Sequence, residues 1–221
     1  LALAQSDDSI DLTTLTLEEL GQIKVTTVSR APREQFDSAA AIEVITQEDI
    51  RRSGATSLAE ALGMAPGLHV ARLDAHSWAI GSRGFNGAFA NKLLVMIDGR
   101  SVYTPLFSGV WWDVQDTVLE DIERIEVIRG PGATLWGANA VNGVINVITK
   151  SARETQGGLL SAGAGTEETG FASFRYGGAL GEKAAFRLYG KYNNRDASRL
   201  PSGALADDRW QMGRLGFRTD W

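Results

Sequence analysis

The chain has 221 residues, 43% of them hydrophobic, and its 22 basic and 27 acidic side chains give a formal net charge of −5. This length suffices for one or two domains with an apolar core. The charge balance provides no basic field of the kind that nucleic-acid-binding proteins use, so we expect no nucleic-acid partner. The chain has no cysteine, which excludes disulfides and thiolate metal sites and is compatible with export.

The N-terminus has the pattern of an exported protein. Ala2 and Ala4 form the small-x-small sequence that precedes a signal-peptide cleavage point, here before Gln5. We therefore interpret residues 1–4 as a signal-peptide remnant and residues 5–37 as an N-terminal extension.

The extension contains two candidate elements. Thr16 and Glu19 have the spacing of a capping box and predict a short helix near residues 17–22. The six residues that follow are rich in β-branched side chains and predict an extended strand, made of Ile23, Lys24, Val25, Thr26, Thr27 and Val28.

Residues 38–150 predict a small α+β domain with a mixed sheet, because short helices and strands alternate irregularly along them. Helices are expected to begin at the capping sequences Thr46–Asp49 and Ser57–Glu60 and to end near Gly54 and Pro66. Strands are predicted at residues 39–46, 68–72, 78–83, 93–97, 125–128 and 144–149.

The stretch 125–150 organises this domain. Its two β-branched strands are joined by a connection in which Gly130, Pro131 and Gly132 exclude both a helix and a central strand. Glycines in and after this connection permit positive φ angles or a close approach of the backbone, so we expect a compact link between two buried strands.

No catalytic constellation is found in the sequence, which lacks the GxSxG, HExxH and P-loop motifs. His69 and His76, with Asp74 between them, permit a metal site, but a surface histidine and a strand histidine explain them more simply. The acidic residues from 113 to 123 are interpreted as the cap and solvated face of a helix near 117–123. We therefore expect no enzyme, no cofactor and no metal site.

After Lys150 the hydrophobic pattern changes to a period of two. Segments of about ten residues present one apolar and one polar face, as the strands of transmembrane β-barrels do. A soluble antiparallel sheet alternates in the same way, so the pattern alone leaves both architectures open. The expected strands lie near residues 157–165, 168–178, 183–193 and 209–221.

Four motifs, in this order, resemble segments of the plug domain of TonB-dependent outer-membrane receptors: Arg83-Gly84-Phe85, Val95-Met96-Ile97-Asp98-Gly99, Arg129-Gly130-Pro131 and Asn142-Gly143-Val144-Ile145-Asn146. The resemblance covers about residues 38–150. It implies a plug domain followed, in residues 151–221, by the start of an antiparallel transmembrane β-barrel. Such a barrel needs about 22 strands, so four imply an incomplete barrel and a truncated receptor.

The resemblance also implies a location and two partners. The location is the bacterial outer membrane, with the plug facing the periplasm and the barrel strands against lipid. The strand at 23–28 resembles the TonB box, which pairs with the periplasmic domain of TonB as an added strand. The alternative is that this strand is an ordinary edge strand of the plug sheet.

The second implied partner is a small ligand whose binding releases the TonB box, so that TonB displaces the plug. A ferric siderophore or other metal chelate is the most frequent ligand of the family, and cobalamin and carbohydrates are alternatives. By order along the chain, the resemblance implies that ligand-binding residues lie in two loops: Arg83, Phe85, Asn86, Tyr103, Phe107, Trp111 and Trp112.

Residues 103–112 hold four aromatic side chains, which provide a large contact area for a flat or hydrophobic ligand at low entropic cost. The alternative is that these rings pack against the barrel wall, and that Arg83 and Arg129 pair with barrel carboxylates. For the whole chain, the alternative hypothesis is a standalone periplasmic plug-like interaction module that does not transport.

Overall fold

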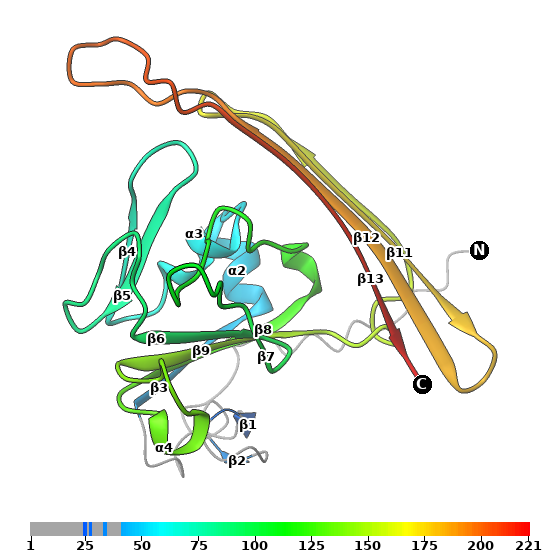
Figure 1. Cartoon of the computed structure of the whole chain (residues 1–221). Coiled ribbons are helices and arrows are strands. Elements are labelled where there is room, and N and C mark those ends of the chain that lie inside the picture. Colours follow the sequence, from blue (N-terminus) through cyan, green and yellow to red (C-terminus); the bar gives the residue numbers. More distant parts are fainter. Residues whose placement is uncertain (1–23, 26, 28–32, 35–40) are drawn as a thin grey trace.

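The computed structural model describes residues 24–25, 27, 33–34 and 41–221. The segment 1–4 and the helix expected near 17–22 lie outside these residues. The described part contains a five-stranded central sheet, a four-stranded long sheet and two small two-stranded sheets (Figure 1). No helix in it is long and apolar enough to cross a membrane.

The central sheet is mixed, with the strand order β3-β8-β9-β6-β7. Strands β6 and β9 are parallel, and the other neighbouring pairs are antiparallel. The pairing of β9 with both β8 and β6 confirms the mixed sheet expected from the sequence. The strands are β3 (Ala41–Thr46), β6 (Leu93–Ile97), β7 (Arg100–Ser101), β8 (Ile122–Arg129) and β9 (Gly143–Thr149).

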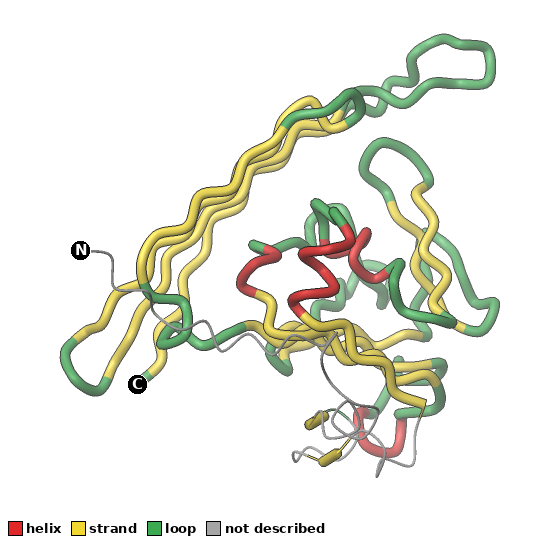
Figure 2. Tube along the Cα trace, turned by 180° about the vertical axis from the view of Figure 1, so that it is seen from behind, coloured by secondary structure: helices red, strands yellow, loops and turns green. Residues whose placement is uncertain are grey.

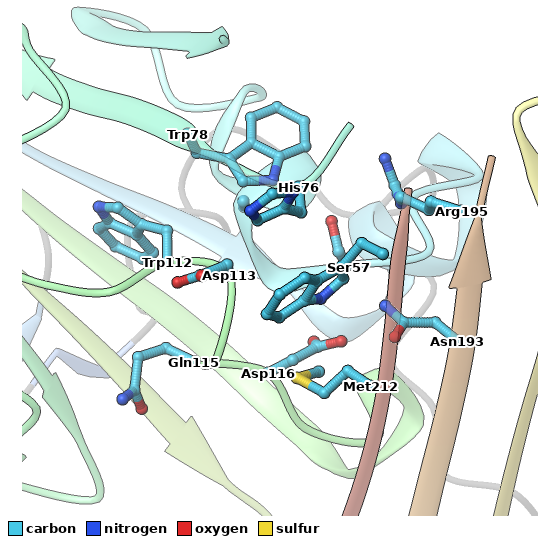
Figure 3. A pocket seen from close by; sticks show the side chains of 12 residues that line it. Ser57, His76, Trp78, Trp112, Asp113, Gln115, Asp116, Asn193, Arg195 and Met212 are labelled. Carbon is cyan, nitrogen blue, oxygen red and sulfur yellow. The ribbon is translucent and has the colours of Figure 1, made fainter. Parts of the chain in front are cut away.

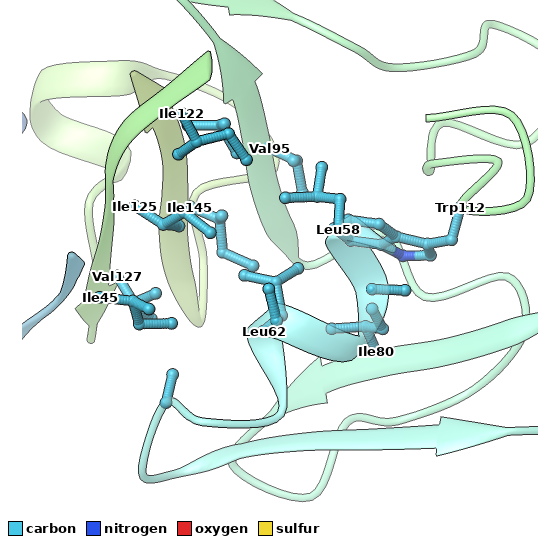
Figure 4. Packing of buried hydrophobic residues seen from close by; sticks show 14 of the residues in the cluster. Ile45, Leu58, Leu62, Ile80, Val95, Trp112, Ile122, Ile125, Val127 and Ile145 are labelled. Atoms are coloured by element: carbon cyan, nitrogen blue, oxygen red, sulfur yellow. The ribbon is translucent and has the colours of Figure 1, made fainter. Parts of the chain in front are cut away.

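Two short helices, α2 (Gln47–Ser53) and α3 (Leu58–Leu62), cover one face of this sheet (Figures 1 and 2). Thr46 caps α2 with a complete capping box, and the Ser57 hydroxyl accepts the amide of Glu60 at the start of α3. Both starts confirm the predicted positions. The helices pack on alternate residues of the strands in the larger apolar cluster, which includes Leu58, Leu62, Val95, Ile125, Val127 and Ile145 (Figure 4).

The opposite face of the central sheet carries a second apolar cluster, to which strand β1 (Lys24–Val25) contributes Val25. Helix α4 (Ala133–Trp136) lies on this side as well (Figure 1). Because both faces are covered, the strands read as continuous apolar runs rather than alternating ones. The sheet residues of this cluster are Ile42, Leu94, Met96, Ile128 and Val144.

Two small sheets complete the compact part of the chain. Strand β1 pairs with β2 (Arg33–Glu34), and β4 (Leu68–Arg72) forms an antiparallel hairpin with β5 (Trp78–Ser82). The hairpin stands beside the central sheet and rises toward one end of the long sheet (Figure 1).

The long sheet consists of four antiparallel strands in sequence order, which confirms the four strands expected after Lys150. Figure 2 shows it as an extended wall that stands to one side of the helices. One face carries exposed apolar side chains, including Leu160, Phe174, Leu188, Leu215 and Phe217. The strands are β10 (Gly157–Gly163), β11 (Glu168–Leu180), β12 (Ala184–Arg195) and β13 (Trp210–Asp220).

The helix predicted near 117–123 is wrong except for one turn. The structure has a 3-10 helix at Leu119–Asp121, and β8 already begins at Ile122. The acidic side chains do not form a solvated helical face, because Asp116 and Asp121 are 3% and 1% exposed. Their partners come from the long sheet, which lies far away in the sequence.

We expect Gly143→Ala to lower the free energy of unfolding by about 1–3 kcal/mol, because overpacking a filled site forces backbone shifts. A Cβ at Gly143 would overlap the carbonyl oxygen of Ile128 and lie 3.0 Å from the Leu93 side chain. Thermal unfolding of the purified chain in detergent measures the effect. Gly87→Ala is the matched control, since a Cβ there meets nothing within 4 Å; equal losses in both variants would contradict this packing argument.

Candidate functional site

Three aromatic rings from two loops form what we call the aromatic cluster: the exposed Phe89 and Trp111 and the half-buried Phe107. Phe107 is central, with edge-to-face contacts to Phe89 at 5.1 Å and to Trp111 at 5.0 Å between ring centroids. Phe89 is 64% exposed and Trp111 39% exposed. Edge-to-face pairs hold rings in fixed orientations, so the cluster is a preformed apolar surface.

The loop after β7 holds this surface in shape through its backbone. The amide of Thr104 donates to the carbonyl of Gly109 at 2.8 Å, and the amide of Ser108 donates to the carbonyl of Thr104 at 3.0 Å. Ser108 has φ of 57°, a left-handed conformation that few non-glycine residues adopt. Gly109 accommodates the Phe107 ring, which a Cβ at that position would overlap.

The structure separates the predicted ligand-binding residues of this loop into two groups. Phe107 and Trp111 belong to the aromatic cluster, whereas Trp112 is 8% exposed and packs in the larger apolar cluster. Tyr103 packs against the second apolar cluster, and its hydroxyl donates to the carbonyl of Leu93 at 3.1 Å. Packing within the domain therefore accounts for the positions of the Tyr103 and Trp112 rings, and neither ring belongs to the aromatic cluster.

The earlier loop gives a different result for each predicted residue. Phe85 is 59% exposed, and Arg83 is also exposed and has φ of 57°. The Asn86 amide contacts the ring nitrogen of His69, and its oxygen accepts the amide of Gly87 at 3.0 Å. Sequence reasoning missed Phe89, although an aromatic residue three positions after Asn86 in a glycine-containing loop was a usable signal.

Two cavities lie between the compact part and the long sheet, and both are smaller than the roughly 300–1,000 Å³ of ordinary ligand pockets. The first, about 20 Å³, is lined by residues that include Trp112, Asp113 and Asn193 (Figure 3). The second, about 200 Å³, lies between α2 and strands β10 to β12. The exposed aromatic cluster is therefore the better candidate for contact with a ligand.

The two histidines have partners that account for them. The His76 ring stacks on Trp210 with 4.3 Å between centroids, and His69 contacts Asn86. In the part of the chain that the structure describes, no group of three or more histidine, aspartate or glutamate residues could hold a metal ion.

Thr27, from the strand predicted at 23–28, is docked on the central sheet. Its amide and hydroxyl both donate to one carboxylate oxygen of Glu126, at 2.8 and 2.5 Å. Its hydroxyl accepts from the Asn146 amide at 3.1 Å, and its carbonyl accepts from the indole of Trp136 at 2.7 Å. We call Glu126, Asn146 and Trp136 the socket.

The socket explains a carboxylate that the sequence pattern does not predict to be buried. Glu126 is 0% exposed in the middle of β8, directly opposite Asn146 on β9. A buried carboxylate requires charged or hydrogen-bonding partners. Arg124 supplies one at 2.9 Å, and Thr27 supplies two more. We call β1 with Thr27, which lies in a turn just after it, the N-terminal strand; Ile23, Thr26 and Val28 lie outside the described residues. It is held by both the apolar packing of Val25 and the polar contacts of Thr27.

A row of cations on β12 faces the compact part of the chain. Arg187, Lys191 and Arg195 recur at every fourth residue, so they share one face, and they are 3%, 7% and 6% exposed. They reach Asp121 at 3.5 Å, Asp116 at 2.6 Å and Glu60 at 2.5 Å, in the same order. In this row the long sheet supplies the cations and the compact part supplies the carboxylates, whereas Arg72 of β4 pairs in the opposite sense with Glu167, next to β11, at 2.5 Å. The pairing of Arg83 and Arg129 with barrel carboxylates stays a prediction.

The ion pair at the end of this row, between Arg195 and Glu60, lowers the pKa of the Glu60 carboxyl. Burial raises the pKa of Glu60, but the hydrogen bonds from Arg195 and Thr56 outweigh it and hold the pKa below the ordinary 4.5. Glu60 therefore stays ionised at neutral pH and remains an ion-pair partner of the long sheet.

Comparison with known proteins agrees with this arrangement. A family model described as TonB-dependent Receptor Plug Domain matches residues 34–144. The vitamin B12 transporter BtuB of Vibrio vulnificus (strain CMCP6) is 32% identical over 170 residues, which are 76% of this chain and 27% of the transporter. The ferric enterobactin receptor PirA of Pseudomonas aeruginosa is 29% identical over 226 positions, covering 91% of this chain and 30% of the receptor.

A solved structure supports the same assignment. The crystal structure of the siderophore receptor PirA from Pseudomonas aeruginosa matches with a TM-score of 0.58 and 28% identity, over 83% of this chain and 32% of that one. A mixed-sheet domain held against an antiparallel sheet with an apolar outer face is the architecture of a plugged outer-membrane receptor. The chain belongs to the TonB-dependent receptor plug family.

Membership of this family assigns the chain to the outer membrane, with the plug facing the periplasm. The relatives described above are receptors and transporters, not enzymes, which agrees with the expectation from the sequence. The chain spans about a third of the length of the curated relatives described above.

We expect Lys191→Met to lower the free energy of unfolding by about 3–5 kcal/mol, because it leaves the Asp116 carboxylate buried without its cation. The side chains of this pair are 6% and 4% exposed. The control, Arg209→Met, breaks an ion pair with Asp196 whose side chains are 66% and 36% exposed, and should cost about 0–1 kcal/mol. Thermal unfolding in detergent compares them; similar losses would contradict a special role for the buried row.

Proposed function

We propose that the protein acts as a TonB-dependent receptor that takes up a scarce small ligand across the outer membrane. The single observation that supports this most is that one plug domain carries both an exposed aromatic cluster and a docked strand resembling a TonB box. In this proposal a ligand binds to the cluster, the strand is released, and TonB pairs with it and displaces the plug.

The apolar outer face of the long sheet favours a transporter over a standalone periplasmic module. Side chains such as Leu215 and Phe217, which are 77% and 76% exposed, have a natural partner in lipid. Exposed apolar patches of this extent are a liability in a freely soluble module. The outer-membrane lipid is therefore a proposed partner of β10 to β13.

We propose a ferric siderophore or another metal chelate, cobalamin included, as the ligand class. Three edge-to-face rings favour a rigid ligand with a flat or apolar face, since such rings provide contact area without losing much conformational freedom. The names of the relatives span the same range, from vitamin B12 to ferric enterobactin. Phe85, Phe89, Phe107 and Trp111, with Arg83 and Asn86 beside them, are the proposed contact residues.

We expect the chain to bind ferric enterobactin or cyanocobalamin, and Phe107→Ala to weaken that binding at least 10-fold, because Phe107 holds both neighbouring rings. Isothermal titration of the detergent-solubilised protein with each probe measures the affinity. Leu106→Ala is the control, since Leu106 is 77% exposed and its ring-free side chain is outside the cluster. Binding of neither probe, or equal affinities in Phe107→Ala and the wild type, would argue against the proposal.

We propose that the strand at 23–28 binds the periplasmic domain of TonB by β-augmentation, which uses its backbone N–H and C=O groups. Val25→Pro removes an N–H and should abolish binding, whereas Thr27→Val loses the hydroxyl contacts to Glu126 and Asn146 and should strengthen it. Pull-down with purified TonB periplasmic domain measures both. Changes in the same direction in the two variants would count against strand pairing and docking as opposing states.

A further inference from the structure

The socket and the aromatic cluster are joined by a very short stretch of chain. Trp136 donates its indole N–H to the carbonyl of Thr27 at 2.7 Å. Three residues later, the Asn139 amide donates to the carbonyls of Ser108 at 3.0 Å and of Asn91 at 3.1 Å. Ser108 directly follows Phe107, and Asn91 is two residues after Phe89. One turn therefore contacts the docked strand on one side and both aromatic loops on the other.

This turn, residues 130–143, has little slack. The amides of Gly130 and Gly132 donate to the carbonyls of Asn142 and Ala140 at 3.0 and 2.8 Å, which closes the turn on itself. Ala140 is fully buried. Three residues span at most about 11 Å of extended chain, so Asn139 and Trp136 stay close together whatever the conformation of the link between them.

Backbone strain is concentrated at the contact between this turn and the aromatic loop. Asn139 has φ of 74° and Ser108 has φ of 57°, and the two residues are hydrogen-bonded to each other. Left-handed conformations are uncommon for non-glycine residues, although asparagine adopts them more readily than serine, and surrounding contacts stabilise them. Loss of this contact would allow both residues to leave the left-handed region.

Tyr103 makes a further contact at the same junction. Burial raises the pKa of Tyr103 above the ordinary 10.0, against the opposing hydrogen bond with Asn139, so its hydroxyl stays protonated. That hydroxyl donates to the carbonyls of Asn91 and Leu93, at 3.4 and 3.1 Å. Tyr103, predicted as a ligand contact, thus braces the loop carbonyl that Asn139 also uses.

We propose that Asn139 and Trp136 are positioning residues that couple occupation of the aromatic cluster to release of the N-terminal strand. This inference rests on the proposed function. A ligand against Phe89 and Phe107 shifts the loops that carry the carbonyls of Asn91 and Ser108, Asn139 loses its partners and relaxes, and Trp136 withdraws from Thr27. The strand is then held by Glu126 and Asn146 without the indole, and its docked population falls.

The test measures release of the N-terminal strand in the absence of any ligand and of TonB. The chain has no cysteine, so Val25→Cys introduces a single thiol at a position that is 0% exposed when docked. The rate of maleimide labelling in detergent then reports the released population. In this background we expect Asn139→Gly and Trp136→Phe each to raise the rate about 10-fold. Glycine retains the positive φ at 139 and removes the Asn139 amide. Phenylalanine retains a six-membered aromatic ring at 136 and removes the indole N–H with part of the indole volume, which the Trp210→Phe control below removes as well.

Two controls separate coupling from general loosening. Trp210→Phe, which removes an indole N–H that has no hydrogen-bond partner among the described residues, should leave the labelling rate unchanged. Lys191→Met weakens the opposite side of the domain and should also leave it unchanged. Because Asn139 and Trp136 act through one turn, the double variant should label no faster than the faster single variant.

Clear outcomes overturn the inference. If Trp136→Phe speeds labelling and Asn139→Gly does not, Trp136 merely holds the strand and no coupling exists. Equal acceleration by Lys191→Met would likewise reduce the effect to lower stability. A separate pull-down with the TonB periplasmic domain tests the proposed function: faster labelling without TonB binding would retain the coupling and reject TonB as the partner.

Discussion

The attachment of the plug domain to the long sheet depends on polar contacts rather than apolar packing. Among the described residues, the two apolar clusters draw all their members from the plug domain and the N-terminal strand, and none from β10 to β13. Apart from the stacking of His76 on Trp210, the contacts described above across the boundary are ion pairs and hydrogen bonds. Arg175 pairs with Asp121 at 2.7 Å, and Arg214 donates to the carbonyl of Val114 at 2.6 Å. Water can replace each of these, which is not true of a shared apolar core. The plug domain therefore fills its apolar clusters without any side chain from the long sheet.

The same polar logic applies to the N-terminal strand. Val25 adds one apolar side chain to the second cluster, but Glu126 and Asn146 place a polar pair in the middle of that face. Glu126 is 0% exposed and Asn146 is 7% exposed, so both side chains need hydrogen-bond partners. Thr27 provides them. A buried carboxylate without a partner destabilises the fold, and a carboxylate that needs a partner favours a docked segment that can donate hydrogen bonds to it. The face thus discriminates for a strand with a hydroxyl at this position.

The fold was predictable from sequence where short-range rules decide it. The capping sequences at Thr46 and Ser57, the buried runs of β6 and β9 and the period of two after Lys150 all depend on residues within one element. The acidic residues near 117–123 were misread because the partners of Asp116 and Asp121 lie on β12 and β11, some 50 to 75 positions further along. No local pattern distinguishes a carboxylate in water from one beneath an arginine of a distant strand.

The candidate site was predictable to a smaller extent for the same reason. Aromatic content identified the loop that holds Phe107 and Trp111, but which rings face outward depends on how that loop meets another. Trp112 follows Trp111 directly, yet it lies in a turn and packs in the core, whereas Trp111 stays exposed. The socket depends on Glu126 being opposite Asn146, a register that only the sheet defines. Sequence thus indicates which residue types are present, and topology decides which of them meet.

The strained residues show where the domain stores conformational free energy. Asp98, with φ of 49°, is held by Thr149, whose amide and hydroxyl donate to its carboxylate at 2.8 Å each. That contact ties a turn to the end of β9, inside the rigid sheet. Asn139 and Ser108 instead contact each other between two loops, and neither residue belongs to a strand. Strain fixed by a sheet is static, because the sheet must open to release it. Strain fixed by one side-chain contact between loops is released when either loop moves, and this difference makes the second junction, and not the first, suited to respond to a ligand.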